Sequence, residues 1–310
     1  MVNKTVPLPA FPVEHRAALR LVWPMRPDFP MRLILLTTLT MAAFAANSVL
    51  NRMAIGSGSI DPMGFAVIRV TTGAAMLALL LGLRRGIWGR AIWPGWHGRT
   101  GGVFGLLVYL FGFSVAYTHL TAGVGALILF GCVQITMFAG AVRTGEQVRP
   151  RRWFGACLAF GGLCLLAAPQ LQAAGASAVA AMAAAGVGWG VYSLEGRKSA
   201  DALAATGWNF LLALPLATGF WLLIRGGGDP AMTAQGILLA TVSGAVTSGL
   251  GYSLWYQLVP QLGAARAAVA QLTVPVIAAA GGLALIGEGI TLRFALASLI
   301  VLGGVAVASR

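Results

Sequence analysis

Residues 141–150, AVRTGEQVRP, interrupt apolar sequence on both sides, and residues 283–292, LALIGEGITL, repeat the Gly-Glu pair in a similar apolar setting. The chain has only eight acidic residues, and two of these, Glu146 and Glu288, each follow a glycine, which calls for an explanation. The three alternatives are a catalytic pair, a coupling site, and a break that ends one helix before the next begins. The sequence around the two pairs distinguishes among them.

The two Gly-Glu pairs belong to an internal repeat. Residues 120–168 and 262–310 align without a gap at an offset of 142 residues, and ten of the 49 aligned positions are identical. The identities include Gly145-Glu146 against Gly287-Glu288. A second match precedes this one, with GFSVAY (112–117) against GYSLWY (251–256) at an offset of 139 residues. The chain therefore consists of two related halves.

The composition identifies a membrane protein. The 310 residues are 58% hydrophobic and 9% charged, whereas soluble domains carry about 25% charged residues. A membrane-crossing helix needs about 20 apolar residues. The predicted fold class is an all-α polytopic membrane protein with ten transmembrane helices, near residues 31–54, 62–83, 101–119, 121–142, 152–169, 176–195, 203–224, 232–256, 263–286 and 291–309.

The basic residues predict the orientation of these spans, because Lys and Arg accumulate on the cytoplasmic side. With a cytoplasmic amino terminus, 17 of the 21 fall inside, three fall outside and Arg69 lies within a span. Both termini are then cytoplasmic, in the cell (inner) membrane. The predicted parts are a flexible cytoplasmic tail (1–30), a first five-helix repeat (31–169) and a second one (176–310). Five is odd, so the halves form an inverted 5+5 repeat, as in many secondary transporters.

This topology decides among the explanations of the Gly-Glu pairs. Gly145-Glu146 and Gly287-Glu288 fall on opposite membrane faces, about 30 Å of hydrocarbon apart, which excludes a catalytic pair. Each pair ends one span and opens the next. Its carboxylate can cap the helix N-terminus that follows or offset the partial positive charge there. We therefore expect a structural or gating role for these four residues.

The second half resembles the drug/metabolite transporter superfamily, EamA-like branch, through LGAARAAVAQLTVPVIAAAGGLALIGEGIT (262–291). Pro275 and Gly287-Glu288 stand where that family has a proline and the following Gly-Glu, whereas Val133 replaces the proline in the first half. The resemblance covers about residues 31–310. It implies movement of metabolites or amino acids, often as export, through a cavity bounded by spans 1, 3, 4, 6, 8 and 9.

Arg69 is the candidate anchor for a substrate carboxylate. It lies about seven residues into span 2, or roughly 10 Å from the outer boundary at about 1.5 Å per residue. An arginine at this depth costs about 2.5–3.5 kcal/mol on insertion scales, so it should face protein or water. The alternatives are a side chain that snorkels outward and a structural pair with a backbone carbonyl.

Aromatic residues follow helical spacing in spans 3, 6 and 8. Such rings either line a ligand cavity or belong to an interfacial belt. The residues are Tyr109, Phe113 and Tyr117 in span 3, Trp189 and Tyr192 in span 6, and Tyr252, Trp255 and Tyr256 in span 8.

Polar residues inside spans need partners, because hydrocarbon offers none. Asn47, Gln134 and Gln271 are candidate substrate-binding residues, although hydrogen bonds between helices also explain them. Pro275 is expected to bend span 9, for gating or only for shape. The stripes Gly101-x-x-x-Gly105 and Gly186, Gly188, Gly190 predict close helix packing.

The function expected from these features is a transporter, an exporter by preference, of small metabolites such as amino acids, including aromatic ones, by alternating access. No acid falls within a span, and the first span lacks the membrane glutamate of small multidrug exporters of the same superfamily. This favours facilitated diffusion (uniport), with a proton-coupled drug or metabolite exporter as the alternative. The expected partners are a small-molecule substrate and the lipid bilayer, and the chain is expected to be a monomer or a weak oligomer.

Other classes of function lack their signatures. The three cysteines and three histidines form no ligand cluster, so neither a metal nor another cofactor is expected. The net charge of +13 suits anionic lipid headgroups and membrane orientation better than nucleic acid. A membrane enzyme would need clustered Asp, His or Ser residues, which are missing from the sequence pattern. A channel remains the other alternative.

Overall fold

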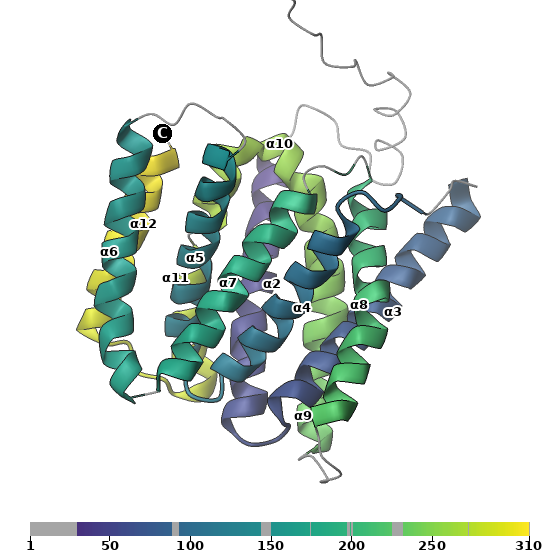
Figure 1. Ribbon diagram of the computed structural model, residues 1–310, viewed down its shortest axis with the longest axis horizontal. Helices are drawn as coiled ribbons and strands as arrows, with labels where there is room; N and C mark the ends of the chain where they lie inside the picture. The colour runs from purple at the N-terminus through teal and green to yellow at the C-terminus, as the bar shows by residue number, and fades with distance from the viewer. Residues whose placement is uncertain are drawn as a thin grey trace, which may run out of the picture.

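The computed structural model describes residues 30–88, 93–143, 150–173, 175–196, 199, 201–224, 232–271 and 273–309. The described chain is almost entirely helical, and its helices lie side by side (Figure 1). The first half contains α2 (Pro30–Gly56), α3 (Pro62–Trp88), α4 (Arg99–Ala116), α5 (Ala122–Arg143) and α6 (Pro150–Ala173). The second half contains α7 (Ala176–Gly196), α8 (Ala202–Ile224), α9 (Ala234–Val242), the π-helix η1 (Ser243–Leu250), α10 (Gly251–Gln271), α11 (Val274–Ile286) and α12 (Leu292–Ser309).

The helices have the lengths of membrane spans. Within the described residues, seven helical segments are long and apolar enough to cross a bilayer, and three shorter apolar segments lie in α6, α11 and α12. The prediction of a multi-span, all-α membrane fold is therefore confirmed. The count of ten spans stays a prediction.

Polar side chains cap the starts of three helices. The Asp61 carboxylate accepts hydrogen bonds from the amides of Met63 and Gly64 at the start of α3. Asp201 does the same for α8 and Thr233 for α9. Such caps satisfy amides that have no partner inside the helix. The predicted ends of spans 2 and 5, at residues 83 and 169, come too early, because α3 and α6 continue to Trp88 and Ala173. Arg85 fits the last turn of α3, where positive charge is favourable.

The predicted spans 8 and 9 differ from the observed helices. Helical structure runs from Ala234 through η1 and α10 to Gln271, and α11 begins at Val274. Pro275 does not bend the interior of a helix, contrary to the prediction. It lies in the first turn of α11, where its missing N–H group costs no hydrogen bond.

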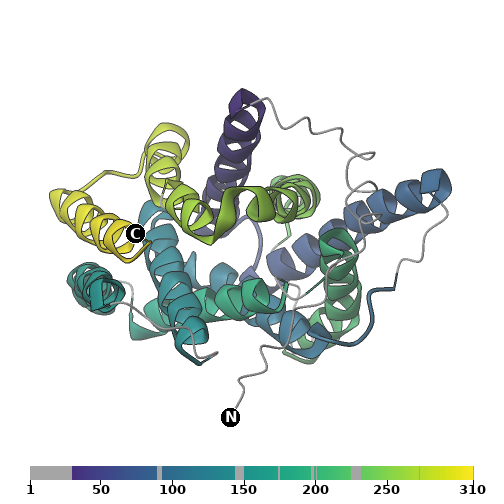
Figure 2. The same ribbon diagram turned by 90° about the horizontal axis from the view of Figure 1, so that it is seen from above.

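The helix contacts follow the repeat. Helix α4 of the first half packs closely against α7 of the second half. Their counterparts in the repeat, η1–α10 of the second half and α2 of the first half, also pack against each other. Likewise, α5 contacts α7 as α11 contacts α2. The repeat mates α3 and α8, α5 and α11, and α6 and α12 contact each other directly. Both views place α6 and α12 together at one edge (Figures 1 and 2). This pattern is the one expected for two halves related by an approximate twofold axis.

Glycines allow the closest approach, between α4 and α7. A Cβ atom on Gly105 would lie 2.7 Å from the Gly188 carbonyl oxygen, and one on Gly188 would lie 2.7 Å from the Gly105 carbonyl oxygen. Both contacts are with backbone, which cannot move as a flexible side chain does. The predicted packing role of these two glycines is therefore supported.

We expect Gly105→Leu to lower the thermal unfolding midpoint of the purified protein, because overpacking typically costs about 1–3 kcal/mol. Gly82→Leu is the matched control, since Gly82 is exposed and nothing lies within 4 Å of a Cβ atom there. Equal midpoints for the two variants in detergent would contradict the packing role.

Candidate substrate-binding site

The guanidinium of Arg69 lies at the centre of the helix bundle with no exposed surface (0%). Its Nε donates to the Ser248 hydroxyl at 2.9 Å, and its Nη2 donates to the hydroxyls of Tyr109 at 2.9 Å and Tyr252 at 3.0 Å. These partners come from η1, α4 and α10, so the cation joins both halves. Because the side chain is buried and bound to hydroxyls, the snorkelling alternative is excluded.

This arginine has no anionic partner among the described residues, where the ion pairs are Arg52–Glu288 and Arg84–Asp201. Its Nη1 atom is buried and lacks a hydrogen-bond partner in that part of the chain. Buried charges in proteins are normally paired with an opposite charge. The unpartnered Nη1 therefore marks a position suited to an anion.

Aromatic rings surround the guanidinium. Its carbon Cζ lies 5.2 Å from the ring centroid of Tyr109 and 5.1 Å from that of Phe113. The Trp189 ring lies 4.8 Å from both Tyr109 and Tyr252, and Phe44 contacts Trp189 and Tyr252 edge-on. Cation–π contacts partly compensate the guanidinium for lost water. The described rings of the predicted stripes therefore meet at a buried site and do not form an interfacial belt. The side chain of Tyr256 lies outside the described part of the chain.

A cavity opens between these side chains. It is lined by Phe44, Asn47, Ser48, Tyr109, Phe113, Leu129, Phe130, Trp189 and Tyr252. The free space has room for about one water molecule. A metabolite would fit here only if the lining side chains moved apart.

The structure brings most of the predicted site residues together. Asn47, Tyr109, Phe113, Trp189 and Tyr252 line the cavity, and Arg69 contacts three of the rings beside it. Tyr192 stacks on Trp189 with centroids 5.4 Å apart, and Trp255 contacts Phe44 at 5.5 Å. Gln134 and Gln271, in contrast, are not among the lining residues.

Several residues at the site were not predicted. Phe44 and Ser48 lie one turn before and one residue after Asn47 on α2, so the polar position in span 1 was a usable signal. Ser248 had no such signal. It lies in a π-helix, where residues shift faces relative to α-helical spacing, and π-helical turns are frequent at functional sites.

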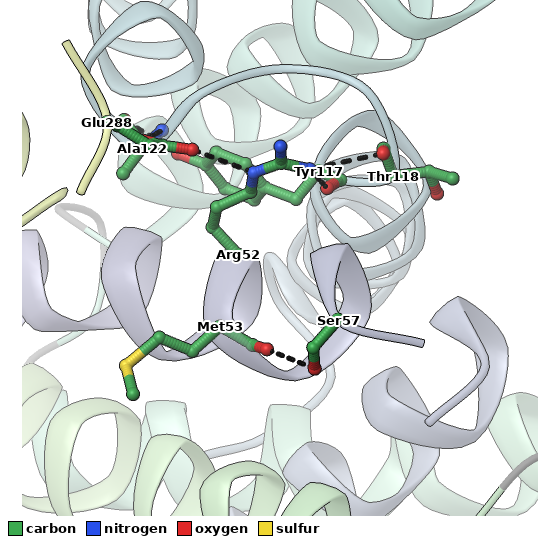
Figure 3. Close-up of polar contacts among 7 residues, drawn as sticks. All are labelled: Arg52, Met53, Ser57, Tyr117, Thr118, Ala122 and Glu288. Carbon is green, nitrogen blue, oxygen red and sulfur yellow. Dashed lines mark hydrogen bonds and ion pairs between the residues drawn. The ribbon is translucent and has the colours of Figure 1, made fainter. Parts of the chain in front are cut away.

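The second Gly-Glu pair joins three segments at the end of the bundle where α2 ends. Arg52 Nε donates to Glu288 Oε1 at 2.8 Å, and its Nη1 donates to the carbonyls of Tyr117 and Thr118 at 3.0 and 3.1 Å (Figure 3). Glu288 Oε2 accepts from the Ala122 amide at 2.7 Å. Glu288 thus caps α5 in the other half. The prediction that it serves the helix following it in sequence is wrong.

Gly287 ends α11 in the left-handed region, with φ of 74°, which favours glycine. Its amide donates to the Leu283 carbonyl, and the Glu288 amide donates to that of Gly282. The predicted role of this pair, to end one helix before the next begins, therefore has a geometric basis. Gly145 and Glu146 lie outside the described residues.

The four described acids all lie away from the cavity. Asp61 and Asp201 cap helices, Glu195 lies beside Gly98 and Gly101 where α4 begins, and Glu288 pairs with Arg52. No group of three or more His, Cys, Asp or Glu that could hold a metal occurs among the described residues. Within the described chain, the site is thus a buried cation without a paired anion, surrounded by aromatic rings.

A multi-span helical fold with a buried, ring-lined cavity and an adjacent buried cation between its halves is typical of a small-molecule transporter. The chain belongs to the EamA-like transporter family, whose model matches residues 31–168 and 176–310. The predicted membership of the drug/metabolite transporter superfamily is confirmed.

Individual relatives agree with this assignment. The chain is 42% identical over 279 residues to the uncharacterized protein PA1977 of Pseudomonas aeruginosa, covering 89% of this chain and 94% of the relative. It is 24% identical over 214 residues to an uncharacterized transporter of Archaeoglobus fulgidus, covering 67% and 75% of the two chains. A solved crystal structure shares the fold with a TM-score of 0.62 at 21% identity, covering 88% of this chain and 96% of that one.

Proposed function

We propose that the chain transports small carboxylate-bearing metabolites with apolar or aromatic bodies across the inner membrane. Aromatic amino acids fall within this class. The observation that carries the proposal is the fully buried Arg69, whose Nη1 lacks a partner in the described chain. A substrate carboxylate would satisfy this group, and the surrounding rings would contact the body of the substrate.

The arrangement of the site between two halves supports alternating access. Arg69 on α3 binds Ser248 and Tyr252 from the second half, so a change in the relative position of the halves changes the site. At the end of the bundle where α2 terminates at Gly56 (the α2 end), Tyr117 contacts Phe113 with ring centroids 4.7 Å apart, and the Tyr117 carbonyl binds Arg52. We propose that this end faces the cell exterior, that both termini are cytoplasmic, and that export is the physiological direction.

We expect transport to be uniport, because no described acid lies at the cavity to carry a coupling proton. In proteoliposomes clamped at zero membrane potential, labelled substrate should equalise across the membrane at the same final level with or without a pH gradient. Protein-free liposomes provide the rate of passive entry. Accumulation above the external concentration that needs both the protein and the pH gradient would contradict uniport and favour the proton-coupled alternative.

A further inference from the structure

We propose that the site selects carboxylates that carry no ammonium group, such as arylalkanoates, over zwitterionic amino acids with the same body. This inference rests on the proposed function and narrows its substrate class. It follows from the balance of charge and of hydrogen-bond donors around the cavity.

The polar groups that line the cavity, and Arg69 beside it, offer donors. Arg69 Nη1 and Trp189 Nε1 are donors that lack partners among the described residues. The Asn47 Oδ1 atom accepts from the hydroxyls of Ser243 and Thr247, which leaves its amide NH₂ as the remaining group. A carboxylate, which only accepts hydrogen bonds, fits this set.

The two tyrosine hydroxyls add to the same imbalance. The Tyr109 oxygen accepts from Arg69 Nη2 and from the Tyr252 hydroxyl at 3.1 Å, which uses both of its lone pairs. Its own proton remains available as a donor. The Tyr252 hydroxyl accepts from Arg69 and donates to Tyr109. Within the described lining, the side-chain acceptors left for an ammonium group are then the Ser48 hydroxyl and the remaining lone pair of Tyr252.

An ammonium group would also meet like charge. An amino acid places its ammonium one carbon from the carboxylate, so binding the carboxylate at Arg69 brings the ammonium close to the guanidinium. The rings of Tyr109 and Phe113, which attract cations, already lie against that guanidinium. The four described acids are engaged at helix ends or on other helices. Like-charge juxtaposition of this kind opposes binding.

Three ligands that share a phenylethyl body test this inference: 3-phenylpropanoate, L-phenylalanine and 2-phenylethylamine. Binding to the full chain in lipid nanodiscs is followed by tryptophan fluorescence, since Trp189 lines the cavity. We expect 3-phenylpropanoate to bind about tenfold or more tightly than phenylalanine, and phenylethylamine to bind most weakly. In Arg69→Lys, which keeps the charge, this order should persist.

The outcomes separate the inference from the proposed function. If 3-phenylpropanoate and phenylalanine both bind, and phenylalanine binds equally or more tightly, the inference is wrong and the proposed function still stands. Failure of all three ligands to bind would overturn both. The comparison among the three ligands is made on the unmodified protein, so these two outcomes do not depend on how well Arg69→Lys folds.

Discussion

Replacing Arg69 with methionine should abolish high-affinity binding of 3-phenylpropanoate without lowering the stability of the empty protein. A hydrogen bond to a charged group contributes about 1.5–3 kcal/mol, which corresponds to a loss of roughly 10- to 150-fold in affinity. The empty protein behaves differently, because it holds a buried charge with no anion among the described residues. Replacing a buried ion with a packed apolar side chain is often neutral or stabilising.

Fluorescence titration and the thermal unfolding midpoint together distinguish a binding role from a structural one. If Arg69 serves mainly to join Ser248, Tyr109 and Tyr252, the variant should unfold at a lower temperature and its folded fraction should still bind the ligand. That combination would contradict the site. Phe130→Leu is a matched apolar change at the cavity wall. It should weaken binding far less, because it removes no charge.

Replacing Glu288 with glutamine should open the α2 end of the bundle. The Arg52 and Glu288 side chains are 21% and 12% exposed, so the pair is partly screened by water, and we assign it about 1–2 kcal/mol. A shift of this size changes the ratio of closed to open states by about 5- to 30-fold. Glutamine also weakens the cap on Ala122, which loosens the connection between α5 and α11–α12.

Cysteine accessibility measures this opening. Ser48→Cys, in a background without Cys132, Cys157 and Cys164, places a thiol at the cavity. A membrane-impermeant maleimide added from the α2 end should label it about 5- to 30-fold faster when Glu288 is glutamine. Arg84→Gln is the control, since it breaks the Arg84–Asp201 pair where α3 ends and α8 begins. An equal increase in the control, or no increase for Glu288→Gln, would contradict the gating role.

The class of fold could be predicted from the sequence, because a membrane-crossing helix needs a long apolar run and cytoplasmic loops accumulate Lys and Arg. The sequence also identified Arg69 and the rings of Tyr109 and Phe113, since a charge inside a span and aromatic residues four apart are local signals. The observed ends of α3 and α6 differ from the prediction for a physical reason. A helix continues past the hydrocarbon wherever its next residues still favour helix, so the end of an apolar run marks the membrane boundary only.

Other features depend on contacts that no local pattern reveals. Arg52 counts as an outer-side charge in the sequence, yet it binds Glu288, a residue 236 positions away. Ser248 reaches Arg69 from a π-helix, whose register cannot be derived from α-helical periodicity. Gln134 and Gln271 are polar residues in expected cavity walls, but neither is among the lining residues. Gln134 lies one turn beyond the lining residue Phe130 on α5, and Gln271 is the last residue of α10.

Exchange of labelled 3-phenylpropanoate across proteoliposome membranes tests the central claim, that Arg69 binds a carboxylate in a carrier with alternating access. Proteoliposomes preloaded with unlabelled 3-phenylpropanoate should take up the label faster than empty ones, because a loaded carrier returns in exchange. Uptake should saturate with concentration and fall to the protein-free rate in Arg69→Met. Uptake that neither saturates nor responds to preloading, as in a channel, or that persists unchanged in Arg69→Met, would contradict the account.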